Sequence, residues 1–153
     1  MSINGNNLKK IVICSGGFDP LHSGHIEYLT QARMLGEYLI VGINSDEWLI
    51  NKKGAYVLPW KERSKIVENL KMVSEILDFD DSDGTAIDLI TKVQSIHPDA
   101  HVIFANGGDR TEKNIPEMNA TNVEFIFGVG GKNKTNSSSS IMLDWYKRVS
   151  LKS

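Results

Sequence analysis

The stretch Gly16-Gly-Phe-Asp-Pro-Leu-His-Ser-Gly-His25 decides how this chain folds. It follows an apolar run over 10–15, which predicts a buried strand, and precedes apolar residues spaced three to four apart over 24–35, which predict a helix. A glycine-rich turn of this kind leaves free backbone N–H groups at the helix N-terminus, where phosphate groups bind well. His22 and His25 add two imidazole donors there. Two incidental loop histidines would not explain why glycines, proline and histidines share one turn.

Strand-like and helix-like segments alternate along the rest of the chain. We expect strands at 38–43, 74–79, 101–105 and 123–127, and helices at 46–51, 60–71, 85–97 and 139–149. The acidic turn Asp80 to Gly84 would supply the N-cap of the helix at 85–97. The alternation predicts an α/β, Rossmann-like fold, in which about five strands form a mainly parallel sheet with helices on both faces. Ligands of such sheets bind beyond the carboxyl ends of the strands.

Bulk properties exclude several classes of function. The 153 residues suit a single domain over 1–153, with 1–9 as a flexible N-terminus. A formal net charge of −2 gives no footprint for nucleic acid, and one cysteine excludes a disulfide framework. The chain has no apolar run of about 18 residues and no signal-like N-terminus, so we expect a cytoplasmic protein without a membrane span.

Further polar motifs fall after the predicted strands. Gly16, Gly17 and Gly24 let a phosphate approach the backbone, and Gly107-Gly108-Asp109-Arg110 pairs two such glycines with an arginine that can bind phosphate bidentately. Asp109 would take a ribose hydroxyl, a base amino group or a magnesium-bound water. The serine run 137–140 offers hydroxyl and N–H donors at a helix start. Asp19 would cap the turn or assist a metal ion, and we favour the cap.

The His22-Ser-Gly-His25 segment resembles the His-x-Gly-His signature of the cytidylyltransferase-like nucleotidyltransferases. The resemblance extends from about Lys10 to Arg148. The Phe104–Thr111 segment looks closest to the heptose-phosphate type and to phosphonate cytidylyltransferase domains. The other matching pieces are Asn44-Ser45-Asp46, Lys52-Lys53-Gly54, Pro59-Trp60-Lys61-Glu62-Arg63, Gly107–Arg110 and Ser137-Ser138-Ser139.

This resemblance implies roles for individual residues. The catalytic residues would be His22, His25 and Lys53, and acceptor binding would fall to Lys53, Asp46 and Arg63. Lys52 and Lys53 would stand on a glycine-containing loop over 52–58. The chain departs from the family in lacking an arginine before the serines, where Lys134 is the candidate replacement. The nucleotide would be bound by Gly16, Gly17, Phe18, Gly24, Gly107, Gly108, Asp109, Arg110, Ser137, Ser138 and Ser139.

The activity implied is transfer of a nucleotide from a nucleoside triphosphate to a phosphate-bearing acceptor, with Mg²⁺ held mainly by the triphosphate. We favour CTP and a small phosphate- or phosphonate-bearing acceptor. An alternative is an adenylyltransferase that uses ATP and a heptose 1-phosphate-like sugar phosphate. An alternative of another class is a non-catalytic nucleotide-binding module, which the intact histidine pair and Lys53 argue against. The resemblance also implies a homodimer, and Trp48 and Trp60 look exposed.

Overall fold

The computed structural model describes residues 8–108, 110–131 and 137–151 and has a five-stranded sheet at its centre. The strands are β1 (Lys10–Gly16), β2 (Tyr38–Ile43), β3 (Glu75–Leu77), β4 (His101–Gly107) and β5 (Glu124–Val129). They lie in the order β3-β2-β1-β4-β5, and every adjacent pair is parallel. The predicted Rossmann-like α/β class is confirmed.

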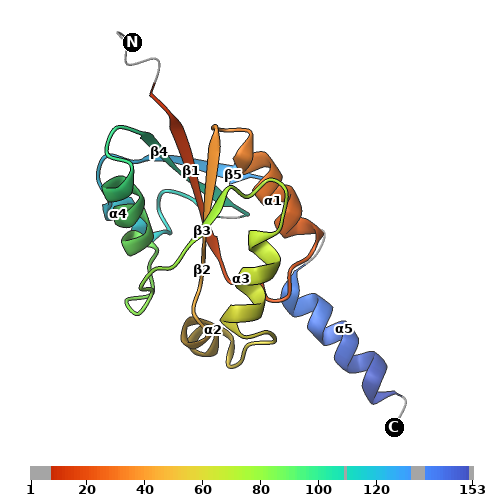
Figure 1. Cartoon of the computed structure of the whole chain (residues 1–153). Helices are drawn as coiled ribbons and strands as arrows, with labels where there is room; N and C mark the ends of the chain where they lie inside the picture. The colour runs from red at the N-terminus through yellow and green to blue at the C-terminus, as the bar shows by residue number, and fades with distance from the viewer. Residues whose placement is uncertain (1–7, 109, 132–136, 152–153) are drawn as a thin grey trace.

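Helices cover both faces of this sheet (Figure 1). Helices α1 (Ser23–Arg33) and α3 (Trp60–Glu68) lie on one face, and α4 (Ile87–Ile96) lies on the other. The short helix α2 (Asp46–Lys53) follows β2, and the 3₁₀ helix η2 (Pro116–Asn119) precedes β5. The last helix, α5 (Ser138–Ser150), projects away from the body (Figure 1). No helix in the described ranges combines the length and apolar character needed to cross a bilayer.

The two-residue period of β1 divides the core into two layers. Val12 and Cys14 pack with Leu29 of α1, whereas Ile11 and Ile13 pack with Leu89 of α4. All six side chains are fully buried. Because β1 is apolar on both faces, it takes the central position that such a strand requires in a parallel sheet.

The position of β1 also determines where a ligand can bind. The chain leaves β1 toward β2 on one side and returns to β4 on the other, so α1, which follows β1, and α4, which precedes β4, lie on opposite faces. A crevice opens at the carboxyl ends of strands at such a switch point. The His22–His25 turn follows β1 at this point.

Several local predictions need correction. The acidic turn does not cap α4, whose N-cap residue is Ala86, because Asp83 accepts hydrogen bonds from the N–H and hydroxyl of Thr85 instead. Helix α3 ends at Glu68 rather than residue 71, and β3 covers only 75–77. Trp48 and Trp60 are half-buried rather than exposed, and the indole N–H of Trp60 donates to the Ile43 carbonyl.

Candidate active site

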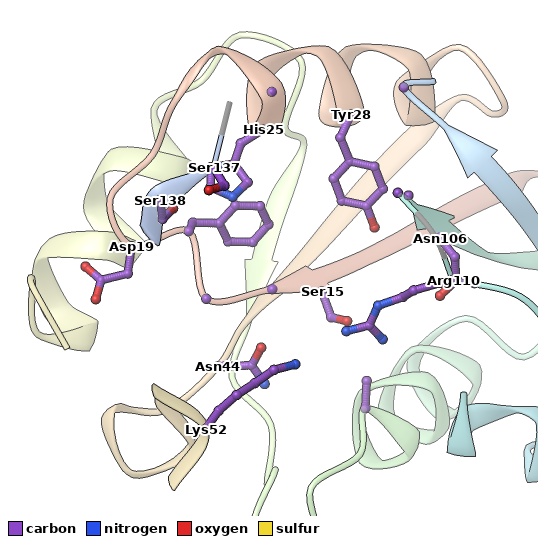
Figure 2. A pocket seen from close by; sticks show the side chains of 18 of the residues that line it. Ser15, Asp19, His25, Tyr28, Asn44, Lys52, Asn106, Arg110, Ser137 and Ser138 are labelled. Carbon is purple, nitrogen blue, oxygen red and sulfur yellow. The ribbon is translucent and has the colours of Figure 1, made fainter. Parts of the chain in front are cut away.

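A cavity of about 1080 Å³ opens at the carboxyl ends of the strands (Figure 2). Its volume is at the upper end of the range of about 300–1,000 Å³ that small-molecule sites occupy. Asp46 and Arg63 do not line it, and Asp109 and Lys134 lie outside the described residues. The predicted site residues that the structure does bring together there are Gly16, Gly17, Phe18, His22, Gly24, His25, Lys53, Gly107, Gly108, Arg110, Ser137, Ser138 and Ser139.

The hydrogen bonds of the two histidines determine which ring nitrogen carries the proton. His22 is the N-cap of α1, and its Nδ1 accepts the Gly24 N–H at 3.0 Å. His25 Nδ1 accepts the His22 N–H at 3.2 Å. A ring nitrogen that accepts a hydrogen bond carries no hydrogen, so each neutral imidazole has its hydrogen on Nε2. Both rings therefore present an Nε2–H donor, with their centroids 3.9 Å apart.

Two neighbours hold these rings in place. A Cβ on Gly24 would lie 2.8 Å from Cε1 of His22, so glycine leaves the ring room to fold back over the helix N-terminus. Phe18 packs its ring edge-on against His25 at 5.1 Å and is buried, which makes it a support for the imidazole as well as part of the cavity wall. Its φ of +51° is unusual for a residue with a side chain and belongs to the tight turn after β1.

A second helix N-terminus meets the histidine turn. Ser137 caps α5 by accepting the Ser140 N–H at 3.1 Å. The hydroxyl of Ser138 donates to the Pro20 carbonyl at 2.9 Å and so ties the start of α5 to the turn that carries His22. Figure 2 shows Ser137 beside His25. Two helix N-termini and two imidazole donors therefore converge on one end of the cavity, which suits a multiply charged anion.

Cationic side chains approach the cavity from two other sides. Figure 2 shows Lys52 and Arg110 extending toward each other from opposite walls, below Ser15. The Lys52 ammonium lies 4.6 Å from the centre of the Trp48 ring, in a cation–π contact, and Lys53 also lines the cavity. The lysines on one wall and Arg110 on the other can therefore neutralise the negative charge of a ligand from two directions.

The sequence predicted that Lys52 and Lys53 stand on a loop, but the structure places them in a helix. Helix α2 continues to Lys53, and Gly54 ends it with a left-handed φ of +89° and an N–H that donates to the Ile50 carbonyl. A glycine at this position is a common helix stop. Lys52 and Lys53 thus occupy the last turn of α2, where the helix dipole favours positive charge.

Arg63 and Asp46 form part of the framework behind the cavity instead of its wall. The Arg63 side chain is fully buried and ion-pairs with Asp46 at 2.6 Å. Its other donors bind the carbonyls of Leu58, Gly17 and Asn44. The predicted direct contact of Arg63 with an acceptor therefore does not fit the structure, because the side chain is buried and each guanidinium nitrogen donates to a protein oxygen. Asp46 is bound to this guanidinium and does not line the cavity.

Asp19 acts as a backbone cap. Its two carboxylate oxygens accept the N–H groups of Val57 and Leu58 at 2.6 and 2.8 Å. Figure 2 shows the carboxylate pointing away from the other labelled side chains. Since both oxygens are used in this way, Asp19 is poorly placed to bind a metal ion. Among the residues that the structure describes, no group of three or more histidine, cysteine, aspartate or glutamate side chains could hold one.

Sequence reasoning missed several residues of the cavity wall. Asn44 and Asn106 are buried and stand at the carboxyl ends of β2 and β4, a placement that the strand pattern could have indicated. Tyr28 donates to the Ala105 carbonyl at 2.6 Å, and burial raises the pKa of its phenol well above the usual range. Gly130 packs so closely on Tyr28 that a Cβ would lie 2.8 Å from the Tyr28 Cα. Glu117 is also in the wall, and no local pattern marks it.

Comparisons with known proteins point to one family. Residues 13–142 match the model of the cytidylyltransferase-like family. The bifunctional protein HldE of Syntrophotalea carbinolica is 35% identical over 147 residues, which cover 92% of this chain and 28% of that protein. The HldE of Campylobacter concisus is 35% identical over 83% of this chain and 26% of its own length. The chain thus spans about a quarter of the length of these curated relatives.

Solved structures share the fold at lower identity. A lipopolysaccharide core biosynthesis protein from Thermoplasma volcanium aligns with a TM-score of 0.62 and 23% identity, over 82% of this chain and 99% of that one. A putative nicotinate-nucleotide adenylyltransferase from Vibrio parahaemolyticus aligns with a TM-score of 0.63 and 18% identity, over 92% of this chain and 88% of that one. These likenesses establish the architecture of the sheet and its helices.

Proposed function

Because the chain belongs to the cytidylyltransferase-like family, we propose that it transfers a nucleotidyl group from a nucleoside triphosphate to a phosphate-bearing acceptor. The observation that carries this proposal is the arrangement of His22 and His25. Each ring uses Nδ1 to accept a backbone N–H and so offers Nε2–H at the N-terminus of α1, beside the N-terminus of α5. The family membership and this donor cluster support the same reaction.

In the proposed reaction, an oxygen of the acceptor phosphate or phosphonate attacks the α-phosphorus of the triphosphate. A new P–O bond forms, the bond between the α-phosphorus and the bridging oxygen breaks, and its electron pair leaves with pyrophosphate. Both reactants are anions, so the barrier depends on charge neutralisation and alignment. The Nε2–H groups of His22 and His25, with the N–H groups of α1 and α5, would stabilise the charge that develops on the triphosphate.

The acceptor phosphate would bind on the lysine side of the cavity. Lys53, our choice from the sequence, lines this wall together with Lys52. Figure 2 shows Lys52 directed into the cavity and Arg110 facing it from the far wall. The nucleoside would lie along Gly107, Gly108 and Gly130. At Gly107 and Gly130 the close packing of Tyr28 leaves no room for a larger residue.

We expect Mg²⁺ to enter with the triphosphate. The described residues provide no carboxylate cluster for it, and both oxygens of Asp19 bind backbone N–H groups. The phosphate oxygens of the nucleotide are themselves hard ligands of the kind that Mg²⁺ prefers. The ion would neutralise part of the phosphate charge, and the histidine and lysine side chains would stabilise the remaining negative charge.

Two nucleotides are candidates for the substrate. We favour CTP, with a small phosphate- or phosphonate-bearing acceptor, because the segments 44–53 and 104–110 look most like a cytidylyltransferase domain. The second candidate is ATP with a heptose 1-phosphate-like sugar phosphate, and the similarity to the HldE proteins favours it. Calorimetric titration of the purified protein with CTP and with ATP in the presence of Mg²⁺ separates them. Tighter binding of ATP would overturn our choice of base.

A non-catalytic nucleotide-binding module is the alternative from another class. Incubation of the protein with four nucleoside triphosphates against several phosphorylated alcohols and sugars decides between the two. Pyrophosphate release that needs both a nucleotide and an acceptor supports the enzyme. Tight nucleotide binding with no release for any pair would favour the module.

We also propose that the protein is a homodimer, as the resemblance to its family implies. Helix α5 presents Leu143, Trp145, Tyr146 and Val149 with about half or more of each side chain exposed. Closed two-fold dimers are the commonest soluble assemblies and would cover such side chains. Sedimentation at micromolar concentration should give twice the chain mass of 17.0 kDa. A single species of 17.0 kDa would refute the dimer.

A further inference from the structure

Glu117 is a buried carboxylate in the cavity wall with only half of its hydrogen bonds made. Its side chain is 4% exposed and belongs to η2, in the connection between β4 and β5. Oε2 accepts the Ala86 N–H at 2.7 Å. Oε1 has no hydrogen-bond partner in the described part of the chain, although less than 1 Å² of its surface is exposed. A buried carboxylate oxygen without a donor is costly, so its retention asks for an explanation.

The surroundings of Glu117 account for one oxygen and not for the other. Ala86 is the N-cap residue of α4 and has no side chain of its own to accept hydrogen bonds. Glu117 Oε2 caps the helix in another way, by accepting the N–H of Ala86 itself, and its negative charge suits the helix N-terminus. This capping role needs a single acceptor. It does not require that Oε1 be turned away from solvent beside a cavity lined by Thr85, Ala86 and Arg110.

The position of Glu117 relative to the end of the cavity that carries His22 and His25 indicates which ligand it would contact. His22 and His25 lie at the start of α1, on one face of the sheet, whereas Glu117 contacts the start of α4, which covers the other face. The nucleotide would occupy the wall of α1, Gly107 and Gly130. The space between the lysines of α2 and the N-terminus of α4 is left for the acceptor.

We propose that Glu117 determines acceptor specificity: Oε1 accepts a hydrogen bond from an O–H or N–H group that the acceptor carries at the end away from its phosphate. This inference rests on the proposed function. The acceptor phosphate pairs with the lysines of α2, and its polar tail reaches α4. Because Oε1 is shielded, the donor reaches it when the carboxylate turns slightly toward the cavity, and the hydrogen bond gained favours that turn.

Glu117→Gln is the appropriate variant for a test. Its amide oxygen can still accept the Ala86 N–H, so α4 stays capped and the protein folds. Its NH₂ group then stands where Oε1 was. The O–H or N–H group of the acceptor substrate would therefore meet a second hydrogen-bond donor instead of an oxygen. Glu112→Gln is the matched control, because Glu112 is exposed in the same connection and does not line the cavity.

The experiment compares 2-aminoethyl phosphate and 2-hydroxyethyl phosphate with propyl phosphate, from which each differs only in the terminal group. A hexose 1-phosphate, which carries several hydroxyls, is added as a larger donor-bearing acceptor. Pyrophosphate release and calorimetric binding are measured for each. We expect the wild type and Glu112→Gln to prefer at least one donor-bearing acceptor over propyl phosphate by about tenfold or more in kcat/KM or affinity. Glu117→Gln should lose this preference while the KM for the nucleotide stays within about twofold.

Three results would overturn the inference. The first is a wild type that treats all acceptors alike, and the second is a Glu117→Gln variant that changes only the melting temperature. The third is a variant in which the KM for the nucleotide and the ratio of CTP to UTP use change instead, which would place the base amino group at Oε1. A protein that binds donor-bearing acceptors selectively but releases no pyrophosphate with any nucleotide would instead contradict the proposed function and leave the role of Glu117 supported.

Discussion

The guanidinium of Arg63 and the carboxylate of Asp46 lie 2.6 Å apart, and the arginine side chain is completely buried. The same Asp46 oxygen accepts the backbone N–H of Trp60, so one carboxylate joins α2 to the start of α3. Arg63 also binds carbonyls from the turn after β1 and from the end of β2. This pair therefore holds together the three segments that carry the histidine turn, the lysines and α3.

We predict that Arg63→Ala lowers the free energy of unfolding by about 3–5 kcal/mol, because it leaves a carboxylate and three carbonyls without their donor. Lys65→Ala on the same helix is the control, since Lys65 is exposed. Chemical denaturation of both variants measures the difference. A folded Arg63→Ala protein of near-parental stability whose KM for the acceptor rises would return Arg63 to the acceptor-binding role that the sequence suggested.

Replacing either imidazole should remove a donor to the triphosphate. We expect His22→Ala and His25→Ala to lower turnover on the order of 10²-fold or more, the usual effect of losing one preorganised donor. His22→Ser separates catalysis from folding, because serine can still cap α1 but has no Nε2–H. His97→Ala serves as the control, since His97 ends α4 and does not line the cavity. Unchanged turnover in a folded His25→Ala variant would argue against the proposed role.

Lys53→Ala should raise the KM for the acceptor by roughly tenfold, and raise it more than the KM for the nucleotide, because one charge-assisted hydrogen bond to phosphate is lost. Lys52→Ala shows whether the neighbour shares this task, as its direction in Figure 2 suggests. Lys61→Ala, an exposed position outside the cavity, controls for general loss of positive charge. An equal rise in both KM values for Lys53→Ala would contradict acceptor binding.

The single cysteine should be inert in the folded protein. Cys14 is fully buried in β1, and burial raises the pKa of its thiol to about 12. At pH 8 the thiolate that reacts with alkylating agents is therefore nearly absent. Labelling with iodoacetamide should be negligible in buffer and rapid in denaturant, as measured by mass spectrometry. Because the folded-state pKa is raised, the stabilisation from a protonated Cys14 is present at neutral pH and is lost as pH rises toward that value.

The fold could be predicted because its signals are local. Each strand contains an apolar run, and the turn after the first strand carries glycines and a proline, so the order of elements follows from short windows of sequence. Element ends were less accurate where long-range contacts decide them. The start of α4 is an example: its cap comes from Glu117, 31 residues further along the chain.

The site was predictable where motif residues are held by their own neighbours. His22 and His25 bond to backbone within three residues, so these contacts belong to one short stretch of sequence. Arg63 and Glu117 differ, because burial and partners from distant segments determine what they do. A charged residue on a predicted surface helix gives no sign that it will be fully buried, as Arg63 is.

The central claim is that the histidine turn catalyses nucleotidyl transfer, and pyrophosphate release tests it most directly. The wild type is incubated with Mg²⁺, CTP or ATP, and a panel of phosphate- and phosphonate-bearing acceptors, with His25→Ala as the matched blank. We predict pyrophosphate release that requires both nucleotide and acceptor and that falls on the order of 10²-fold in His25→Ala. Release at the same rate in the folded His25→Ala variant, or no release by the wild type with any pair, would contradict the claim.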